Sequence, residues 1–590
     1  MEIEKIATTT VVQSISRTDI LSSFINDGDK EPCWDGAIYV YNNRNKKKEN
    51  LKGRVPVQVK GKRVSGSTVN KEITYPIEVI DLKNYLNDGG TVFFVVYMNE
   101  KNEEQIYYAA LLPFYINCLL YEKEEQKTIS VKLKPFPITN NEKCNIFLDF
   151  VADSKHQKGK VEPNVLSLKD FSTIKEIDEL SFSYTGLGYN PDRPFEYLFT
   201  HQVYLYAKPK GLNIKIPVQY LEKIDVAKTT IKKSVEIEGH EFYTAYEVLH
   251  RIDRDELQFG KSIRLGVYKN GEVKLDYKLN GTLNERICDV EFIIALLKKQ
   301  KITIEGTDIP LAITKDEIAA FGIDELEDNL HYMQEVRMVL DELKVAVDLD
   351  CSNLSSRDEK LIQVLVAAIK YKEPVKFDTN NSIPVMARLN FSNLTLVLMY
   401  EKIEDNSYII KNLSDENKWR CEAEDVNGNK FPSSIYMILK KNDFREICNI
   451  DYEDMWKSII SIEQSEVYLE YVNMLLLQMI LAYDEGAIQQ DKLFEVALKI
   501  AHFLKDEERF SENIAKLNYL QLLKRKGELS DNQVDELCKM IQTPNQNTEI
   551  LIGAHLLMDN QLIAKRYFNN LSNEEQKEFR KFPISKFIQF

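Results

Sequence analysis

Three polar residues near the N-terminus have the types and spacing that phosphodiester hydrolysis requires. Asp35 stands early in a β-forming segment, residues 34–41, and Gln58 and Lys60 belong to a second such segment that begins at residue 55. Side chains two positions apart on a strand project from the same face, so Gln58 and Lys60 share a face. A hairpin between the two strands would bring Asp35 beside that face, and we therefore expect the three groups to converge.

The chemistry of these three groups is coherent. Asp35 supplies a hard oxygen ligand for Mg²⁺ or Mn²⁺, and Gln58, or the backbone carbonyl beside it, supplies a second oxygen. Lys60 is a cation that can orient or help deprotonate an attacking water and can stabilise the charge that builds on a phosphate. Taken alone, an aspartate followed by Q-x-K is a short pattern that also arises by chance.

The segments WDG and VPVQVKGK, which contain these residues, resemble the D…(E/Q)xK core of the PD-(D/E)XK nuclease superfamily. They are particularly similar to the branch found in prokaryotic defence and restriction systems. The resemblance covers residues 5–130 and implies that Asp35, Gln58 and Lys60 are catalytic, with Asp35 and Gln58 as ligands of Mg²⁺ or Mn²⁺. Two features depart from the family pattern: the predicted first helix has Asp19 as its only acid and no glutamate, and Gln58 replaces the commoner glutamate.

The elements that position these residues follow an α/β order. The pattern predicts a helix over residues 8–25, strands over 34–41 and 55–59, a helix over 77–86, and strands over 91–98 and 105–112. The apolar run TVFFVVYM is typical of a strand that is covered on both faces. We therefore expect a nuclease-like α/β domain with a mixed sheet over residues 1–135, followed by a connector over 136–165.

The remainder of the chain divides into three further regions. Residues 166–310 predict a β-rich mixed domain, in which Asn270-Gly271 marks a hairpin, and residues 311–450 predict helices plus β-strand segments. Residues 451–590 predict an all-α module with little Pro or Gly. The stretch 555–568 resembles a helical hairpin of a tetratricopeptide-like array, but no clean repeat of ~34 residues is present. An irregular helical bundle is the alternative interpretation.

Basic residues gather around the proposed site. Nine Lys and Arg residues and one acid, Glu49, lie between residues 43 and 63. Such a cluster can neutralise phosphates in an otherwise acidic protein, although a Lys-rich loop is more often a solvated turn. The predicted nucleic-acid-binding residues are Lys46, Lys47, Lys48, Lys52, Arg54, Lys62 and Arg63.

Composition excludes several other classes of protein. The net charge of −15 argues against general coating of nucleic acid, and 44% hydrophobic with 29% charged residues is ordinary for globular domains. Eight cysteines without a C-x-x-C pair predict reduced thiols rather than a zinc site. No P-loop, signal peptide or membrane-spanning run is found, so we expect a cytoplasmic protein with no membrane partner.

These observations favour a metal-dependent endonuclease that acts on DNA, with RNA as the other candidate substrate. The family resemblance implies a role in prokaryotic anti-phage defence. The middle and C-terminal regions would then regulate or assemble the enzyme, with the C-terminal helices as the docking site for a protein partner; a homo-oligomer stays open. The alternative is a non-catalytic protein of nuclease fold that binds nucleic acid or serves as a scaffold.

Overall fold

The computed structural model describes residues 2–590 except 27–31, 66–70, 122, 124, 158–176, 191–192, 194, 212, 312, 378–384, 405, 415–419 and 426. The chain forms two compact units. Unit 1 comprises Met1–Thr230, Glu247–Leu257 and Gly266–Glu272, and unit 2 comprises Ile231–Tyr246, Gln258–Leu265 and Val273–Phe590. The candidate residues Asp35, Gln58 and Lys60 therefore all belong to unit 1.

Unit 1 is built around a seven-stranded mixed sheet of order β1-β2-β3-β5-β6-β7-β4. β3 and β5 run parallel, and every other neighbouring pair in this sheet is antiparallel. Its strands are β1 (Leu21–Ile25), β2 (Gly36–Tyr41), β3 (Leu51–Arg63), β4 (Ile73–Glu78), β5 (Thr91–Met98), β6 (Glu104–Leu111) and β7 (Thr128–Pro135). The predicted mixed sheet and its strands 34–41, 55–59, 91–98 and 105–112 are thereby confirmed.

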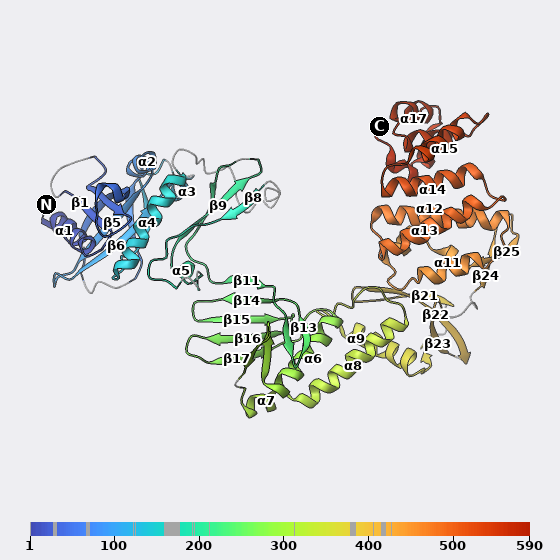
Figure 1. The fold of residues 1–590 in the computed structure, drawn as a ribbon, viewed down its shortest axis with the longest axis horizontal. Coiled ribbons are helices and arrows are strands. Elements are labelled where there is room, and N and C mark those ends of the chain that lie inside the picture. The colour runs from blue at the N-terminus through green and yellow to red at the C-terminus, as the bar shows by residue number, and fades with distance from the viewer. Residues whose placement is uncertain are drawn as a thin grey trace. The chain divides into compact units, whose positions relative to one another are not determined.

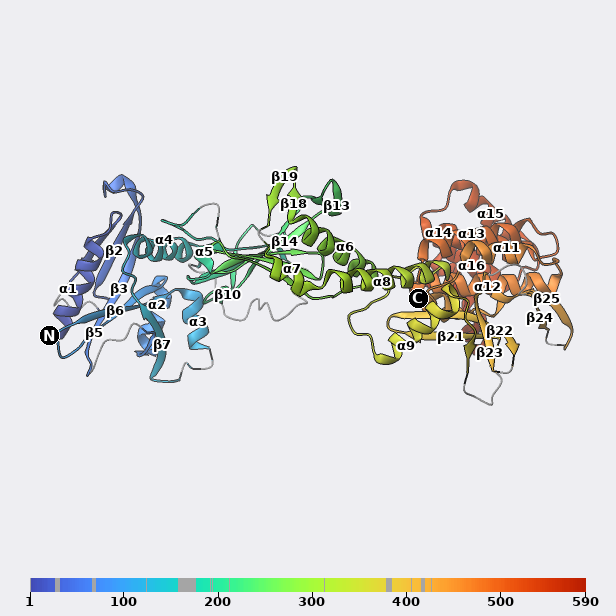
Figure 2. The ribbon, with the colours of Figure 1, turned by 90° about the horizontal axis from the view of Figure 1, so that it is seen from below.

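Helices cover both faces of this sheet, and α1 and α4 lie alongside it in Figures 1 and 2. On one face, α1 (Glu2–Ser16) and α4 (Asn140–Gln157) share a hydrophobic core with β2, β3 and β5. On the other face, α2 (Val79–Asp88) and α3 (Pro113–Leu120) pack on β5, β6 and β7. The run TVFFVVYM of β5 sends alternate side chains into both cores, which explains why it is apolar throughout.

Two sequence predictions in this region are wrong. The helix predicted over residues 8–25 is instead α1, which ends at Ser16, followed by a turn at Thr18 and the strand β1. The connector predicted over 136–165 contains α4, whose buried Phe147 and Val151 belong to the same core as the sheet. Pro135 and Pro137 precede this helix rather than interrupt it.

Unit 1 also contains a small antiparallel sheet of β8 (Ile177–Ser181), β9 (Val203–Pro209) and β10 (Ile216–Leu221), together with α5 (Phe195–Leu198). The loop before α5 is fixed to α4 by hydrogen bonds. The Asn145 side chain accepts a hydrogen bond from the backbone N–H of Leu187 at 2.9 Å and donates one to the Leu187 carbonyl at 3.2 Å. Asp149 accepts a hydrogen bond from the backbone N–H of Thr185 at 2.7 Å. α4 is therefore shared between the large sheet and this smaller one.

The middle of the chain holds several further sheets, as predicted for residues 166–450. A five-stranded sheet has the order β11-β14-β15-β16-β17, and the turn at Asn270-Gly271 joins its last two strands, with Gly271 at φ +86°. Its strands are β11 (Ala227–Ile231), β14 (Tyr246–His250), β15 (Arg254–Phe259), β16 (Ile263–Tyr268) and β17 (Val273–Tyr277).

The other sheets of the middle region are smaller, with the orders β13-β12-β18-β19, β20-β23-β22-β21 and β24-β25. Their strands are β12 (Val235–Ile237), β13 (His240–Tyr243), β18 (Lys301–Ile304), β19 (Thr307–Pro310), β20 (Val375–Lys376), β21 (Met386–Phe391), β22 (Leu394–Glu404), β23 (Ser407–Asn412), β24 (Arg420–Glu424) and β25 (Lys430–Ser434). The helices between them are α6 (Leu283–Lys299), α7 (Lys315–Phe321), α8 (Ile323–Glu342), α9 (Ser356–Leu365) and α10 (Lys441–Glu446).

The C-terminal region is all-helical, which confirms the prediction for residues 451–590. Side chains of Asp451, Ser465 and Ser572 cap helix N-termini. The helices are α11 (Tyr452–Ile460), α12 (Glu466–Glu485), α13 (Gln490–Asp506), α14 (Glu512–Lys526), α15 (Asp531–Gln542), α16 (Thr548–Leu557), α17 (Gln561–Phe568) and α18 (Asn573–Phe579). Within the described residues, no helix combines the length and apolar character needed to cross a bilayer.

Candidate active site

Asp35 is held at the point where β2 begins beside β3. Its backbone N–H donates to the carbonyl of Val57 at 3.0 Å, and its own carbonyl accepts from the N–H of Asn26 at 2.9 Å. The next residue must be glycine, because Gly36 has φ +150° and a Cβ there would lie 2.2 Å from the carbonyl oxygen of Phe24. The Asp-Gly pair therefore follows from the close approach of β1 to β2.

The side chain of Asp35 reaches the edge of β3 just past the end of its pairing with β2. Its Oδ2 accepts hydrogen bonds from the Gln58 Nε2 at 2.6 Å and from the Val59 backbone N–H at 2.7 Å. Gln58 is buried, with 5% of its surface exposed. The positive charge of Lys60 acts on the same carboxylate and favours its ionised form. The structure thus brings Asp35, Gln58 and Lys60 together.

The charge of a fourth residue, Glu4, also acts on Asp35. Burial raises the pKa of the Asp35 carboxyl above its usual range, the Val59 hydrogen bond and Lys60 oppose that rise, and the negative charge of Glu4 adds to it. Glu4 is exposed and lies on α1. The first helix therefore contains a glutamate whose charge acts on Asp35, which corrects the prediction that it has none.

Sequence reasoning missed Glu4 because it started the helix at residue 8. The signal was present, since Ile3, Ala7 and Val11 recur at intervals of four, which is the spacing of one helix face. That face lies very close to β3: a Cβ on Gly61 would come within 2.7 Å of the Ile3 Cγ2 and 2.8 Å of the Ile3 carbonyl oxygen. Gly61 of the VQVKGK segment therefore lets α1 approach the strand that carries Lys60.

Residues of α2 and the loop before β2 form the neighbouring wall. The Cys33 thiol accepts from the Asn84 Nδ2 at 3.0 Å, and burial raises the pKa of that thiol, so it stays protonated and unreactive. The Trp34 ring packs on Tyr85, with 6.0 Å between ring centroids, in the core on this side of the sheet. Trp34 therefore serves as a core anchor.

The donor set around Asp35 suits a hard divalent cation. Within the part of the chain that the structure describes, no three His, Cys, Asp or Glu side chains form a group that could hold a metal. The available ligands are therefore the Asp35 and Glu4 carboxylates and the amide oxygen of Gln58. Mg²⁺ accepts such a set, because it keeps several waters and takes only one or two protein carboxylates. A cation here would also offset the charge repulsion between Asp35 and Glu4.

The predicted nucleic-acid-binding residues separate into two groups along β3. Lys62 and Arg63 follow Lys60 after Gly61, and the Lys62 ammonium lies 5.8 Å from the ring centroid of Tyr97. The hairpin residues come before Gln58, the residue opposite Asp35: on β3, Arg54 and Lys52 lie roughly 13 and 20 Å from it at ~3.3 Å per residue, and the other hairpin lysines precede the strand. This second group consists of Lys46, Lys47, Lys48, Lys52 and Arg54.

Some of the hairpin cations are already engaged. Lys46 donates to the backbone carbonyls of Thr18 at 3.1 Å and Leu21 at 2.6 Å, so it fastens the hairpin to the α1–β1 turn. Lys52 acts electrostatically on Asp149 of α4. Counted along β3 from Gln58, which lies opposite Asp35, Arg54 and Lys62 are equally near at four positions each, and the hairpin tip is farther away.

Asp35 thus accepts hydrogen bonds from Gln58 and Val59 where β2 begins beside β3, and the charges of Lys60 and Glu4 act on its carboxylate. Such a set can hold a hard cation, orient a water molecule and offset the charge of a phosphate. Comparison of the chain with protein-family models, with curated protein sequences and with solved structures found no match.

Proposed function

We propose that the N-terminal domain is a metal-dependent nuclease of the PD-(D/E)XK type that hydrolyses phosphodiester bonds, with DNA as its first candidate substrate. The observation that carries this proposal is the meeting of Asp35, Gln58 and Lys60 with Glu4, a residue from a different element. The order of elements supports it: a helix, an antiparallel three-stranded meander, the edge strand β4, a helix and a strand parallel to the third strand, which apart from β4 is the order that the family resemblance implies.

Each residue has a distinct role in this reaction. The Asp35 and Glu4 carboxylates and the Gln58 amide oxygen would hold Mg²⁺ or Mn²⁺, which supplies Lewis-acid activation of water and phosphate. Lys60 stands beside Asp35, where its ammonium can orient the attacking water and stabilise the charge that develops on the phosphoryl oxygens. Lys62 and Arg63 extend the positive charge along β3 and would contact neighbouring phosphates.

The test uses the purified full-length chain with plasmid, linear and single-stranded DNA and with RNA, in Mg²⁺, Mn²⁺ or EDTA. We expect cleavage that EDTA abolishes. Lys60→Ala and Asp35→Ala should each lower the rate by roughly a hundredfold or more, because each removes a group that acts on the transition state. Lys101→Ala, which removes an exposed lysine from the turn between β5 and β6, is the matched control and should cut like the wild type.

Glu4→Gln separates this proposal from one that relies on the three predicted residues alone. It keeps the size of an exposed side chain and removes one carboxylate, so the fold should be unaffected while cleavage falls. If Asp35→Ala and Lys60→Ala both cut as fast as the wild type, the nuclease site is not the one described.

The hydrogen bonds that the Asp35 carboxylate already accepts favour a second candidate function. Its Oδ2 already accepts two hydrogen bonds, from Gln58 and Val59, which is also what a purely structural carboxylate does. In this alternative the domain binds nucleic acid or a protein without cleaving it. The same experiment decides: no cleavage of any substrate in either metal, with binding retained in EDTA, would favour the binding protein.

The biological setting of the proposal comes from the family resemblance. We infer a role in prokaryotic anti-phage defence, in which the middle sheets and the C-terminal helices regulate or assemble the nuclease. Deletion of the gene in its host, followed by phage challenge, tests that role. Unchanged plaque counts across a broad phage panel would contradict it.

A further inference from the structure

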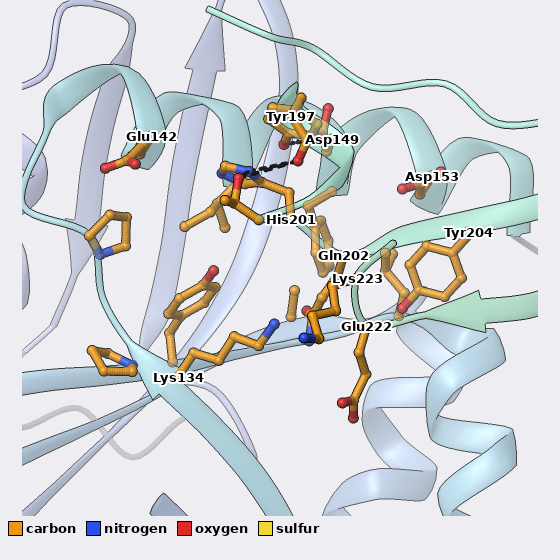
Figure 3. A pocket seen from close by; sticks show the side chains of 18 of the residues that line it. Lys134, Glu142, Asp149, Asp153, Tyr197, His201, Gln202, Tyr204, Glu222 and Lys223 are labelled. Carbon is orange, nitrogen blue, oxygen red and sulfur yellow. Dashed lines mark hydrogen bonds between the residues drawn. The ribbon is translucent and has the colours of Figure 1, made fainter. Parts of the chain in front are cut away.

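A cavity of about 660 Å³ lies in unit 1 between α4, the strands β6 and β7, and the segment that contains α5, β9 and β10 (Figure 3). This size falls in the range of small-molecule sites, ~300–1,000 Å³. Asp35, Gln58 and Lys60 do not line it, so the cavity is separate from the candidate active site. The side chains of its own wall therefore decide what it can bind.

Acidic side chains dominate the charge of the cavity wall. Among the described residues, the wall contains five carboxylates and two lysines: Glu72, Glu142, Asp149, Asp153 and Glu222, and Lys134 and Lys223. Both lysines have acidic neighbours, because Lys223 forms a salt bridge with Asp225 at 3.1 Å and the charges of Glu72 and Glu222 act on Lys134. The surplus of negative charge therefore belongs to α4.

The three acids of α4 lie along one face of the helix. Glu142, Asp149 and Asp153 are separated by seven and then four positions, which are the spacings of a single helix face, and Figure 3 shows all three along α4. At 1.5 Å per residue they extend over about 16 Å. None of the three forms a salt bridge with a described residue. This side of the cavity is thus a row of negative charges without cations of its own.

Asp153 presents an acceptor that the described residues leave unsatisfied. Only 6% of its surface is exposed, and its Oδ1 accepts a hydrogen bond from the Tyr206 hydroxyl at 2.7 Å. Its Oδ2 has no hydrogen-bond partner among the described residues, yet it is not one of the polar atoms that are sealed from solvent. Because Asp153 lines the cavity, a hydrogen-bond donor of a ligand can reach this oxygen and satisfy it.

The spread of the acids along α4 suits an extended cation rather than a metal ion. Within the part of the chain that the structure describes, no three His, Cys, Asp or Glu side chains form a group that could hold a metal. Apolar side chains separate the acids instead, since Ile146 and Phe150 lie on the same face of α4, and Leu112 and Phe199 also line the cavity. Methylene groups pack on such side chains, while ammonium groups interact favourably with carboxylates and aromatic ring faces.

We propose that this cavity binds a linear aliphatic polyamine, a methylene chain that carries two or more ammonium groups. One ammonium group donates to the Asp153 Oδ2, and the next lies at Asp149, about one helical turn away. The methylene chain packs on Ile146 and Phe150, and a third ammonium group extends towards Glu142. The proposal does not depend on the nuclease activity, because none of its groups belongs to the Asp35 site.

Isothermal titration calorimetry of the full-length chain with spermidine, in EDTA at pH 8, tests this assignment. Burial raises the pKa of Asp149 to about 6 and that of Asp153 to about 7, so both are ionised at this pH. We expect spermidine to bind with one site per chain. Butylamine, which has a single ammonium group, should bind at least about tenfold more weakly, because it loses a charge-assisted contact. Mg²⁺, added without EDTA at matched ionic strength, should not displace spermidine.

Three variants locate the site. Asp153→Asn should weaken spermidine binding by roughly tenfold or more, because it removes the charge of a charge-assisted contact. Lys134→Met should instead tighten binding about three- to tenfold, because it removes a like charge from the cavity wall. Asp88→Asn, which removes an exposed carboxylate outside the cavity wall, is the matched control and should bind like the wild type. A polyamine attracted only by the net charge of −15 would respond equally to either aspartate substitution.

The inference is overturned if spermidine does not bind at millimolar concentration, or if Asp153→Asn binds it as tightly as Asp88→Asn. Equal affinities for butylamine and spermidine would contradict the polyamine assignment, and weaker binding to Lys134→Met would contradict the charge argument. Displacement of spermidine by Mg²⁺ would assign the acids to a metal ion. Cleavage assays on the same variants keep the two proposals distinct, since all three variants leave the Asp35 site intact.

Discussion

The buried carboxylates of α4 should make unit 1 more stable at mildly acidic pH than at pH 8. Asp153 is 6% exposed, and its Oδ1 accepts a hydrogen bond from the Tyr206 hydroxyl at 2.7 Å. Burial raises the pKa of Asp153 to about 7, with a further contribution from the charge of Asp149, while the Tyr206 hydrogen bond opposes the rise. Burial likewise raises the pKa of Asp149 to about 6.

The direction of the pH effect follows from proton binding. The ordinary pKa of the carboxyl is 3.8, so between pH 4 and pH 7 the folded protein holds a proton at Asp153 that the unfolded chain does not. Stability therefore rises as the pH falls through the folded pKa. Each unit by which the folded pKa exceeds the ordinary pKa corresponds to about 1.4 kcal/mol, so the ionised Asp153 destabilises the fold by about 4 kcal/mol above pH 7. Lowering the pH from 8 to 5 should recover about 2–3 kcal/mol of that amount.

Asp153→Asn tests this magnitude. The amide oxygen can still accept the Tyr206 hydrogen bond, but the side chain no longer ionises. We expect the variant to be more stable than the wild type at pH 8, and this advantage should shrink by about 2–3 kcal/mol at pH 5. Urea unfolding followed by fluorescence at pH 8, 6.5 and 5 measures the difference for the transition of unit 1.

Asp88→Asn is the matched control for this experiment, because Asp88 is an exposed carboxylate at the end of α2 in the same unit. It should shift the unfolding midpoint little at any of the three pH values. A difference between wild type and Asp153→Asn that stays constant from pH 8 to pH 5 would refute the reasoning, because it would mean that Asp153 is ionised throughout that range.

Three further predictions follow from individual contacts. Gly61→Ala should lower the free energy of unfolding by about 1–3 kcal/mol and reduce cleavage, because its Cβ would lie 2.7 Å from the Ile3 Cγ2 and force α1, with Glu4, away from β3. A variant that is as stable as the wild type in urea unfolding and cleaves as fast would contradict this. Gln58→Glu should tighten Mg²⁺ and Mn²⁺ binding measured by calorimetry, since a second anionic oxygen favours a hard cation, and unchanged or weaker affinity would show that Gln58 faces no metal. Tyr204→Phe should leave the stability of the protein unchanged or higher, whereas Tyr206→Phe should lower the free energy of unfolding by about 1–3 kcal/mol. The reason is that the Tyr206 hydroxyl forms hydrogen bonds with Asp153 and Gln157, while the Tyr204 hydroxyl has no partner among the described residues. Equal losses in urea unfolding would contradict the assignment of partners.

Much of the N-terminal fold could be predicted from local pattern. The alternation in β2 and β3 and the apolar run of β5 identified the strands around Asp35, and the C-terminal helices followed from sparse Pro and Gly. The errors have local causes. Helix α4 was missed because Pro135, Pro137 and Asn140 suggested a connector, although Cys144, Phe147, Leu148 and Val151 have helical spacing.

Other features could not be predicted, because they depend on contacts between segments far apart in the chain. Glu4 lies about thirty residues before Asp35, and its place beside that carboxylate requires α1 to lie against β3. The cavity around Lys134 requires the segment that holds Tyr197 and Tyr204 to fold back onto α4. No short sequence motif predicts either arrangement, because the residues that flank each of these side chains in the sequence form no recognisable pattern.

Strand β3 connects two groups of carboxylates that different helices carry. Gly53 and Gly61 lie on the face of this strand that meets the helices: a Cβ on Gly53 would come within 2.6 Å of Val151 of α4, and one on Gly61 would meet Ile3 and Ala7 of α1. α1 therefore brings Glu4 to the end of β3 that holds Gln58 and Lys60, and α4 brings Asp149 and Asp153 to the other end. The two helices approach the strand through separate glycines about 26 Å apart, and hydrogen bonds from Asn140 and Lys143 of α4 to the backbone of Arg17 and Ser14 join them, so a change that displaces α1 also acts on α4.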